Sequence, residues 1–279
     1  MVSSEKQTDM IERVSGTARR RRVRYFEMVD HWLNRLGRFV AAVHEGCWLG
    51  YLSADDLNAL TADFYEKSQY YASTEHTLSG FFDWERSALD RYFQPGSSVL
   101  VAAAGAGREI LALLRAGFHA EGFECNLSLL RATRTILEQL SEPNCLIHCA
   151  PDRVPAVPPI YQGIIVGWSS YSHVPTKERR IGFLQSLHRR VLPRSPVLVS
   201  FFIRDDRSRY EAAVYRMTTF CRIFARGRRE PPERGDRIDM GCYLHSFTRE
   251  EVEAELRSAG FALAYFNAEG DAHAVGIAE

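Results

Sequence analysis

The chain has 279 residues, and its 35 Lys and Arg residues balance 35 Asp and Glu residues, so the formal net charge is zero. Hydrophobic residues make up 46% and charged residues 25%, which is ordinary for a globular protein. The balance argues against a nucleic-acid binder that works by general electrostatic attraction. The length allows one large domain with an accessory piece.

Apolar stretches and cysteines exclude further classes. The apolar stretches are short and broken by charge, so we expect no membrane-spanning helix. Residues 1–16 lack the apolar segment of a secretory signal. None of the six cysteines forms a CxxC pair, so we expect reduced thiols, no metal site and a cytoplasmic location. The cysteines are Cys47, Cys125, Cys145, Cys149, Cys221 and Cys242.

Residues 1–95 predict an N-terminal helical cap. Apolar residues recur at roughly the 3.6-residue spacing over 6–43, which indicates one long helix, and Gly46 and Gly50 are expected to end it. Arg residues gathered at 19–24 form either a solvated helix face or a patch for an anionic partner.

A second helix is expected around 57–65, with Ser53 as its N-cap and acidic residues in its first turn. The segment 64–93, which overlaps the end of this helix, is rich in aromatic and hydroxyl side chains. Such a mixture packs as a helical cap on a core, and it also suits the cover of a ligand pocket.

From residue 97 the chain alternates short apolar runs with amphipathic stretches. This alternation predicts right-handed βαβ units and a parallel sheet that is buried on both faces. The predicted strands are 99–104, 118–125, 145–150, 164–168 and 196–202. Further along, Thr248 and Glu251 form a capping box at the start of a late helix, and the C-terminal segment predicts an antiparallel hairpin.

A glycine turn follows the first predicted strand. Gly105 and Gly107 allow the backbone to approach a ligand closely, and Glu124 at the tip of the second strand can accept both hydroxyls of a ribose. This combination indicates a cofactor that contains adenosine. A dinucleotide fingerprint would have a third glycine where Ile110 stands, so a sulfonium nucleoside fits better than a diphosphate.

At this point the sequence resembles the class I S-adenosylmethionine-dependent methyltransferases, over about residues 60–279. The resemblance lies in VLVAAAGAGRE, in GFECN, in PD after the third strand, in the segment that contains IIVGWSSYSH, and in FTREEVEAELRSAGF. The family often has an acid before its glycine turn, where this chain has Val101, and a first glycine where it has Ala103.

The resemblance implies an α/β fold: a Rossmann-like, seven-stranded, mostly parallel sheet with a C-terminal antiparallel hairpin and an N-terminal helical cap. Residues 96–279 would form the methyltransferase core. Within it, the insertion at 204–240 would form a lid over the substrate. Its many Arg side chains would either recognise a carboxylate or phosphate or form a solvated helix face.

The resemblance also implies roles for individual residues toward S-adenosyl-L-methionine. Asp152 would either accept from the adenine amino group or only cap its loop, and Trp168 would lie near the methyl donor or belong to the core. The implied cofactor-binding residues are Tyr70, Tyr71, Ala104, Gly105, Gly107, Glu124, Cys125, Asp152, Trp168 and Ser169.

A general base helps methyl transfer when the acceptor is a hydroxyl or a protonated amine, and imidazole titrates in a suitable range. His173 and Tyr171, in the loop after the fourth strand, form the leading catalytic pair, and His245 and His76 are further candidates. Each of these side chains taken alone could instead make an ordinary structural hydrogen bond.

The predicted function is methyl transfer to a nitrogen or oxygen atom of a small molecule. A methyltransferase for a protein or RNA is the first alternative, since Arg residues gather at 19–24 and in the insertion. A non-catalytic relative that only binds the cofactor and a nicotinamide oxidoreductase are the others. We expect no membrane partner, the sequence argues against nucleic acid, and it leaves room for a homodimer.

Overall fold

The computed structural model describes residues 3–155, 160–224 and 230–279, with side chains from residue 20 onward. Its centre is a seven-stranded sheet with the order β3-β2-β1-β4-β5-β10-β9. The strands are β1 (Ser98–Ala102), β2 (His119–Glu124), β3 (Leu146–His148), β4 (Gly163–Val166), β5 (Pro196–Ser200), β9 (Phe261–Asn267) and β10 (His273–Ala278).

Five strands are parallel, and the C-terminal hairpin is antiparallel, with β10 beside β5 and β9 at the edge. The predicted α/β fold is therefore confirmed. β1 lies between β2 and β4, so the chain reverses its winding direction at β1. In open α/β sheets, the crevice at such a switch point, outside the carboxyl ends of the strands, is where ligands bind.

Helices cover both faces of the sheet. α4 (Asp83–Tyr92), α5 (Arg108–Arg115) and α6 (Leu127–Gln139) pack on one face, and α7 (Lys177–His188) and α9 (Arg249–Ser258) pack on the other. Successive residues of β1 join opposite clusters, Val101 with α5 and Ala102 with α7. This alternation explains why the strand is apolar throughout: each side chain meets a helix.

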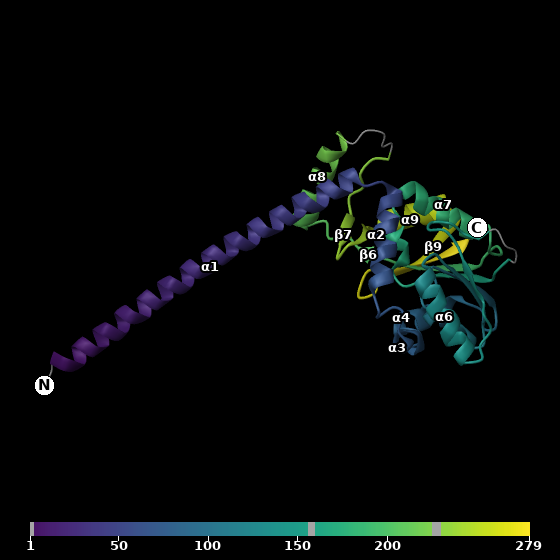
Figure 1. The fold of residues 1–279 in the computed structure, drawn as a ribbon, viewed down its shortest axis with the longest axis horizontal. Helices are drawn as coiled ribbons and strands as arrows, with labels where there is room; N and C mark the ends of the chain where they lie inside the picture. Colours follow the sequence, from purple (N-terminus) through teal and green to yellow (C-terminus); the bar gives the residue numbers. More distant parts are fainter. Residues whose placement is uncertain (1–2, 156–159, 225–229) are drawn as a thin grey trace.

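Four helices precede the sheet: α1 (Ser3–Tyr51), α2 (Ala54–Lys67), α3 (Thr74–Leu78) and α4. α1 extends far beyond the body of the molecule, and its C-terminal part packs along α8 (Arg209–Arg222) (Figure 1). The helix continues through Gly46 and ends at Tyr51, so the prediction of its end is wrong for Gly46, whereas Gly50 lies one residue before the end. A Cβ at Gly46 would lie 2.6 Å from Cβ of Met217, and one at Gly50 would lie 2.7 Å from Cβ of Cys221. The two glycines allow the helices to approach closely.

This close approach gives a prediction for Gly46→Ala. Alanine normally stabilises a helix interior relative to glycine by about 0.5–1 kcal/mol, but here the added methyl group overpacks the α1–α8 contact. We expect a net loss of about 1–3 kcal/mol in the free energy of unfolding, measured with denaturant. Gly37→Ala is the matched control, because nothing lies within 4 Å of its added Cβ. An equal effect of both substitutions would contradict the packing role.

The insertion at 204–240 contributes one strand to a small sheet that the sequence did not predict. β6 (Phe202–Ile203), β8 (Cys242–Phe247) and β7 (Asp236–Asp239) form a second sheet in that order. α8 and β8 enclose a small apolar cluster with α1 and α2. The described part of the insertion packs on α1. Its role as a lid stays a prediction, and residues 225–229 lie outside the described ranges.

Arginine residues of the insertion are used for internal ion pairs. Arg204 binds Glu251 at 2.6 Å, and Arg237 binds Glu45 of α1 at 2.6 Å. These contacts hold the insertion to α9 and α1, so the two guanidinium groups are not directed at a ligand. Within the ranges that the structure describes, no helix has the length and apolar character needed to cross a membrane.

Candidate functional site

A large cavity lies at the carboxyl ends of β1, β2 and β4, and α2 covers it. It has about 1180 Å³ of space between atoms, its open mouth included. Among the predicted site residues, those that line it are Tyr71, Ala104, Gly105, Glu124, Cys125, Asp152, Trp168 and His173. His76, a further candidate, also lines it. The structure thus brings together residues that follow four strands, β1 to β4, and residues of the helical cap.

The glycine turn and Glu124 form one unit. The Glu124 carboxylate accepts hydrogen bonds from the backbone N–H of Gly105, at 2.8 Å, and of Asn126, at 2.7 Å. Gly105 has a positive φ of 54°, and a Cβ there would meet nothing within 4 Å, so this residue leaves space at the cavity. Each carboxylate oxygen can accept a further bond, and the group is therefore suited to a ligand diol.

Gly107 is placed differently from the prediction. A Cβ on this residue would lie 2.4 Å from Cγ2 of Thr133 on α6, and Gly107 does not line the cavity. Its function in the structure is to let α5 begin close to α6. The missing third glycine is also explained, because Gly122 of β2 makes room for Ile110: a Cβ there would lie 2.9 Å from Cδ1 of Ile110.

Asp152 links the sheet edge to the cap. Its Oδ2 accepts a hydrogen bond from Nδ2 of Asn58 on α2, at 2.6 Å, and pairs with Arg179 at 3.2 Å. Burial raises the pKa of this carboxyl, and the bonds from Asn58 and Arg179 oppose the increase. Asp152 has a positive φ of 57°, and its side chain lies at the cavity wall.

A tyrosine–histidine pair lies between the cap and the sheet. His173, at the end of η1 (Ser170–His173), contacts the backbone oxygen of Tyr243 through Nδ1 at 2.7 Å, and its Nε2 lies 3.1 Å from the hydroxyl of Tyr65. A carbonyl oxygen can only accept, so the proton is on Nδ1, and Nε2 accepts from Tyr65. Burial lowers the pKa of His173 and raises that of Tyr65 well above its ordinary value. Both groups are therefore neutral at pH 7.

The lowered pKa of His173 predicts a pH dependence of stability. The unfolded chain takes up a proton on this imidazole near pH 6.5, before the folded chain does. The free energy of unfolding therefore falls as the pH drops below about 6.5. His173→Asn keeps a donor for Tyr243, and we expect it to lose less stability on acidification than the wild type. Denaturant unfolding above and below pH 6.5 measures the free energy of unfolding, with exposed His119→Asn as the control. An equal loss of stability on acidification in the wild type and in His173→Asn would refute the prediction.

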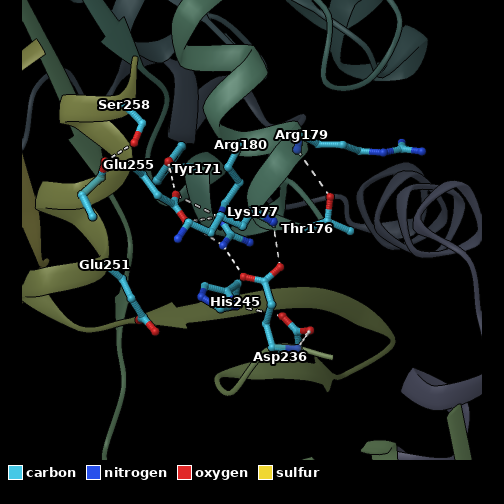
Figure 2. A network of polar contacts seen from close by, with 12 residues as sticks. Tyr171, Thr176, Lys177, Arg179, Arg180, Asp236, His245, Glu251, Glu255 and Ser258 are labelled. Atoms are coloured by element: carbon cyan, nitrogen blue, oxygen red, sulfur yellow. Dashed lines mark hydrogen bonds and ion pairs between the residues drawn. The ribbon is translucent and has the colours of Figure 1, made fainter. Parts of the chain in front are cut away.

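Tyr171 and His245 lie outside the cavity, in a buried polar network that Figure 2 shows. The Tyr171 hydroxyl donates to Glu255, and its ring stacks on Phe247 with centroids 5.1 Å apart. Nδ1 of His245 lies 2.8 Å from Oδ1 of Asp236. Neither can contact a molecule in the cavity from this position, which corrects the prediction that they are catalytic.

The network is held by compensated charges. Arg180 bonds to Glu255 at 2.7 Å and to Glu233 at 2.5 Å (Figure 2). Burial alone would raise the pKa of Asp236, but hydrogen bonds from His245 and Tyr243 outweigh burial and lower it. Because the carbonyl of Tyr243 also binds His173, this network fixes the strand that positions the imidazole.

Two further predicted residues, Tyr70 and Ser169, lie next to the cavity without lining it. Tyr70 is 61% exposed and contacts Tyr71 edge-on outside the lining, and the backbone N–H of Ser169 donates to Ser200 at 2.7 Å, which shapes the turn after β4. Neither residue therefore lines the cavity in which the predicted contact with the cofactor would be made. Trp168 does line the cavity, and its indole N–H donates to Asp271 at 3.1 Å.

A buried charge cluster forms one wall. Arg108 binds Glu85 through two bonds of 2.6 Å and Glu109 at 2.7 Å, and both Arg108 and Glu109 line the cavity. Burial would lower the pKa of Arg108, but Glu109 and Glu85 outweigh it and raise it. Burial, together with Glu109, raises the pKa of Glu85 despite the bonds from Arg108. Two carboxylates against one guanidinium leave a net charge of −1, which favours a cation in the cavity.

Several lining residues were missed from the sequence. Tyr65 belongs to the aromatic segment that was recognised, but nothing local distinguishes it from Tyr70. Asn126 caps α6 through its side chain and donates to the carbonyl of Ala62, and a capping position was its only signal. Asn58 has no local signal, because its partner Asp152 lies 94 residues away.

No family model and no curated protein sequence matches the chain. Solved structures do match its fold. A 1,6-didemethyltoxoflavin-N1-methyltransferase from Burkholderia thailandensis has a TM-score of 0.56 and 16% identity, over 81% of this chain and 90% of that one. An amino pentose methyltransferase from Micromonospora echinaspora has a TM-score of 0.54 and 16% identity, over 76% and 97%. An S-adenosylmethionine-dependent methyltransferase from Methanosarcina mazei has a TM-score of 0.53 and 15% identity, over 71% and 96%. The likeness is one of fold.

Proposed function

Because the chain has the fold of the class I S-adenosylmethionine-dependent methyltransferases, we propose that it transfers a methyl group from S-adenosylmethionine to a nitrogen or oxygen atom of a small molecule. The observation that carries this proposal is the pairing of Glu124 with the N–H of Gly105 in a cavity at the switch point of the sheet. A carboxylate held there accepts the two hydroxyls of a ribose.

The remaining cavity walls support the same cofactor. Cys125 and Asp152 would lie along the adenine, with Asp152 as acceptor for its amino group. Ala104 and Gly105 would lie along the methionine tail. Glu109 would receive the ammonium of that tail and take the place of the acid that is absent at Val101. The net charge of −1 on the cluster of Arg108, Glu85 and Glu109 supports this assignment.

Enclosure by the cap supports a small acceptor. The cavity is lined by aromatic and apolar side chains, with a few polar groups such as Thr61, Tyr65 and His76 directed at it. The neighbours named for an amino pentose and for 1,6-didemethyltoxoflavin act on small molecules. The alternative of a protein or RNA acceptor loses support from the insertion, since Arg204 and Arg237 form internal ion pairs.

The bound cofactor supplies an activated methyl group. The chain's own residues then have to hold the acceptor in line and exclude water. The Tyr65 hydroxyl donates a hydrogen bond to Nε2 of neutral His173, which leaves the lone pairs of the Tyr65 oxygen for a group in the cavity. A proton from the acceptor's nitrogen or oxygen would pass to the Tyr65 oxygen while the proton of Tyr65 moves to Nε2 of His173, so Tyr65 and His173 replace Tyr171 and His173 as the proposed catalytic pair. The free thiols support a cytoplasmic location as part of the proposal.

Calorimetric titration of the full chain with S-adenosylmethionine, S-adenosylhomocysteine and NAD tests the proposal. We expect both sulfur nucleosides to bind and NAD not to bind. Binding of NAD alone would overturn the proposal in favour of an oxidoreductase. A screen of amines and phenols with labelled S-adenosylmethionine then tests transfer, and binding without transfer to any acceptor would favour the non-catalytic relative.

A further inference from the structure

The exposed part of α1 carries a continuous apolar face with no partner in the described chain. From residue 20 to 41 the helix extends away from the body (Figure 1), and its apolar side chains are largely exposed. Trp32 is 63% exposed and Leu33 is 61% exposed. A soluble helix normally buries such a face, so an exposed one indicates an interaction surface.

The spacing of this face identifies the kind of partner. Its centre, which we call the α1 stripe, alternates steps of three and four residues without a break, the repeat by which one helix packs along another. The α1 stripe consists of Phe26, Val29, Leu33, Leu36, Val40 and Val43. Tyr25, Trp32 and Phe39 follow the same seven-residue period along one flank, and the polar residues Glu27, Asp30 and Asn34 lie on the other side of the helix.

We propose that the α1 stripe pairs with the α1 stripe of a second copy of this chain, in the antiparallel direction. Seven large apolar side chains of the stripe and its aromatic flank are exposed. If each buries on the order of 100 Å², the contact covers about 700 Å² per protomer, close to the ~800 Å² of a stable interface.

Charge selects the antiparallel direction. Arg20, Arg21, Arg22 and Arg24 lie at one end of the stripe. A parallel pair would bring the two Arg groups within a Debye length, about 8 Å in physiological salt, whereas an antiparallel pair separates them by the stripe, roughly 30 Å long. In the antiparallel pair the aromatic flanks also face each other, and Trp32 meets its own counterpart near the two-fold axis.

The first test is the mass of the full chain in solution. Size-exclusion chromatography with light scattering at micromolar concentration should give twice the chain mass. The double variant Leu33→Glu with Leu36→Glu should have the mass of one chain. Asn34→Glu, on the opposite side of the helix, should keep the mass of two chains. Circular dichroism checks that each variant is folded. A monomeric wild type, or a folded double variant that remains a dimer, would overturn the proposal.

Cross-linking tests the direction. Under copper phenanthroline oxidation, Trp32→Cys should give a disulfide-linked dimer above the level of the parent chain, and Phe26→Cys should not. The reverse pattern would overturn the antiparallel arrangement.

Because Arg residues border the stripe, the chain is also sedimented with phosphatidylserine vesicles. A monomer that binds these vesicles through Leu33 and Leu36 would replace the second copy with an anionic membrane surface and overturn the proposal.

Discussion

A Glu124→Gln variant is expected to bind S-adenosylmethionine about 100-fold more weakly than the wild type, since each hydrogen bond to a charged group is worth ~1.5–3 kcal/mol. The amide keeps one acceptor oxygen but directs an NH₂ group at the backbone N–H of either Gly105 or Asn126. The variant therefore disturbs the glycine turn and also loses the charge that would hold the ribose. Calorimetric titration measures the change.

The control for this variant is Glu138→Gln, an exposed carboxylate on α6. It makes the same change from carboxylate to amide and should leave the affinity for S-adenosylmethionine unchanged. Thermal unfolding separates loss of binding from loss of folding, because ligand should raise the melting temperature of the wild type and of the control only. Unchanged affinity in a folded Glu124→Gln variant would disprove the ribose assignment.

An Arg108→Met variant is expected to lose about 3–5 kcal/mol of stability and roughly 10 °C in melting temperature, because it leaves buried carboxylates without their counterion. Glu85 is 1% exposed and Glu109 is 5% exposed, and both depend on this guanidinium. Met retains much of the apolar stem but loses the guanidinium that lies over the Phe82 ring, so the loss reports on the charge together with this cation–π contact. Scanning calorimetry measures it.

Two comparisons make the result specific. Arg115→Met, on the exposed end of α5, should change stability by no more than about 0.5 kcal/mol. Arg108→Met combined with Glu85→Gln removes one of the uncompensated carboxylates and should be more stable than Arg108→Met alone. If the double variant is less stable than the single one, uncompensated charge is not the cause of the loss.

The sheet could be predicted from the sequence because its signals are local. β1, β4 and β5 are apolar runs bounded by turns, and each side chain needs only to be apolar to pack under a helix. The second sheet could not be predicted. β6 has two residues, and β7 reads DRID, so neither has the composition of a buried strand. Their pairing depends on β8 and on contacts with α1.

The glycine residues show the same contrast between roles that a local pattern reveals and roles that depend on distant contacts. At Gly105 the sequence between a strand and a helix was enough to indicate a ligand turn. At Gly46 and Gly50 the same residue type was interpreted as a helix end, because the reason for its small size lies in α8, about 170 residues away in the chain. Close packing between distant helices leaves no local pattern.

In the candidate site, too, some placements follow from the sheet topology and others depend on distant side chains. The approach of Glu124 to Gly105 follows from topology, since adjacent parallel strands end at one edge. The hydroxyl of Tyr171 was expected at that edge, but Glu255, 84 residues further on, turns it into the core. Tyr65 reaches His173 across 108 residues through the packing of α2. Side-chain direction thus depends on partners that a local pattern does not contain.

The two sides of α2 have a kinetic consequence. Leu57 and Leu60 anchor the helix in an apolar cluster with α1 and α8, whereas Asn58 and Tyr65 tie it to the sheet side by hydrogen bonds and by the edge-on contact of the Tyr65 ring with His173. Water can replace either partner of such a bond at a net cost of about 0.5–1.5 kcal/mol. We therefore expect α2 to separate from the strands along this mostly polar contact before the apolar cluster opens. Under the proposed function, entry and exit of the ligand would follow the motion of this one helix, and we expect that motion, rather than methyl transfer, to limit the rate of turnover.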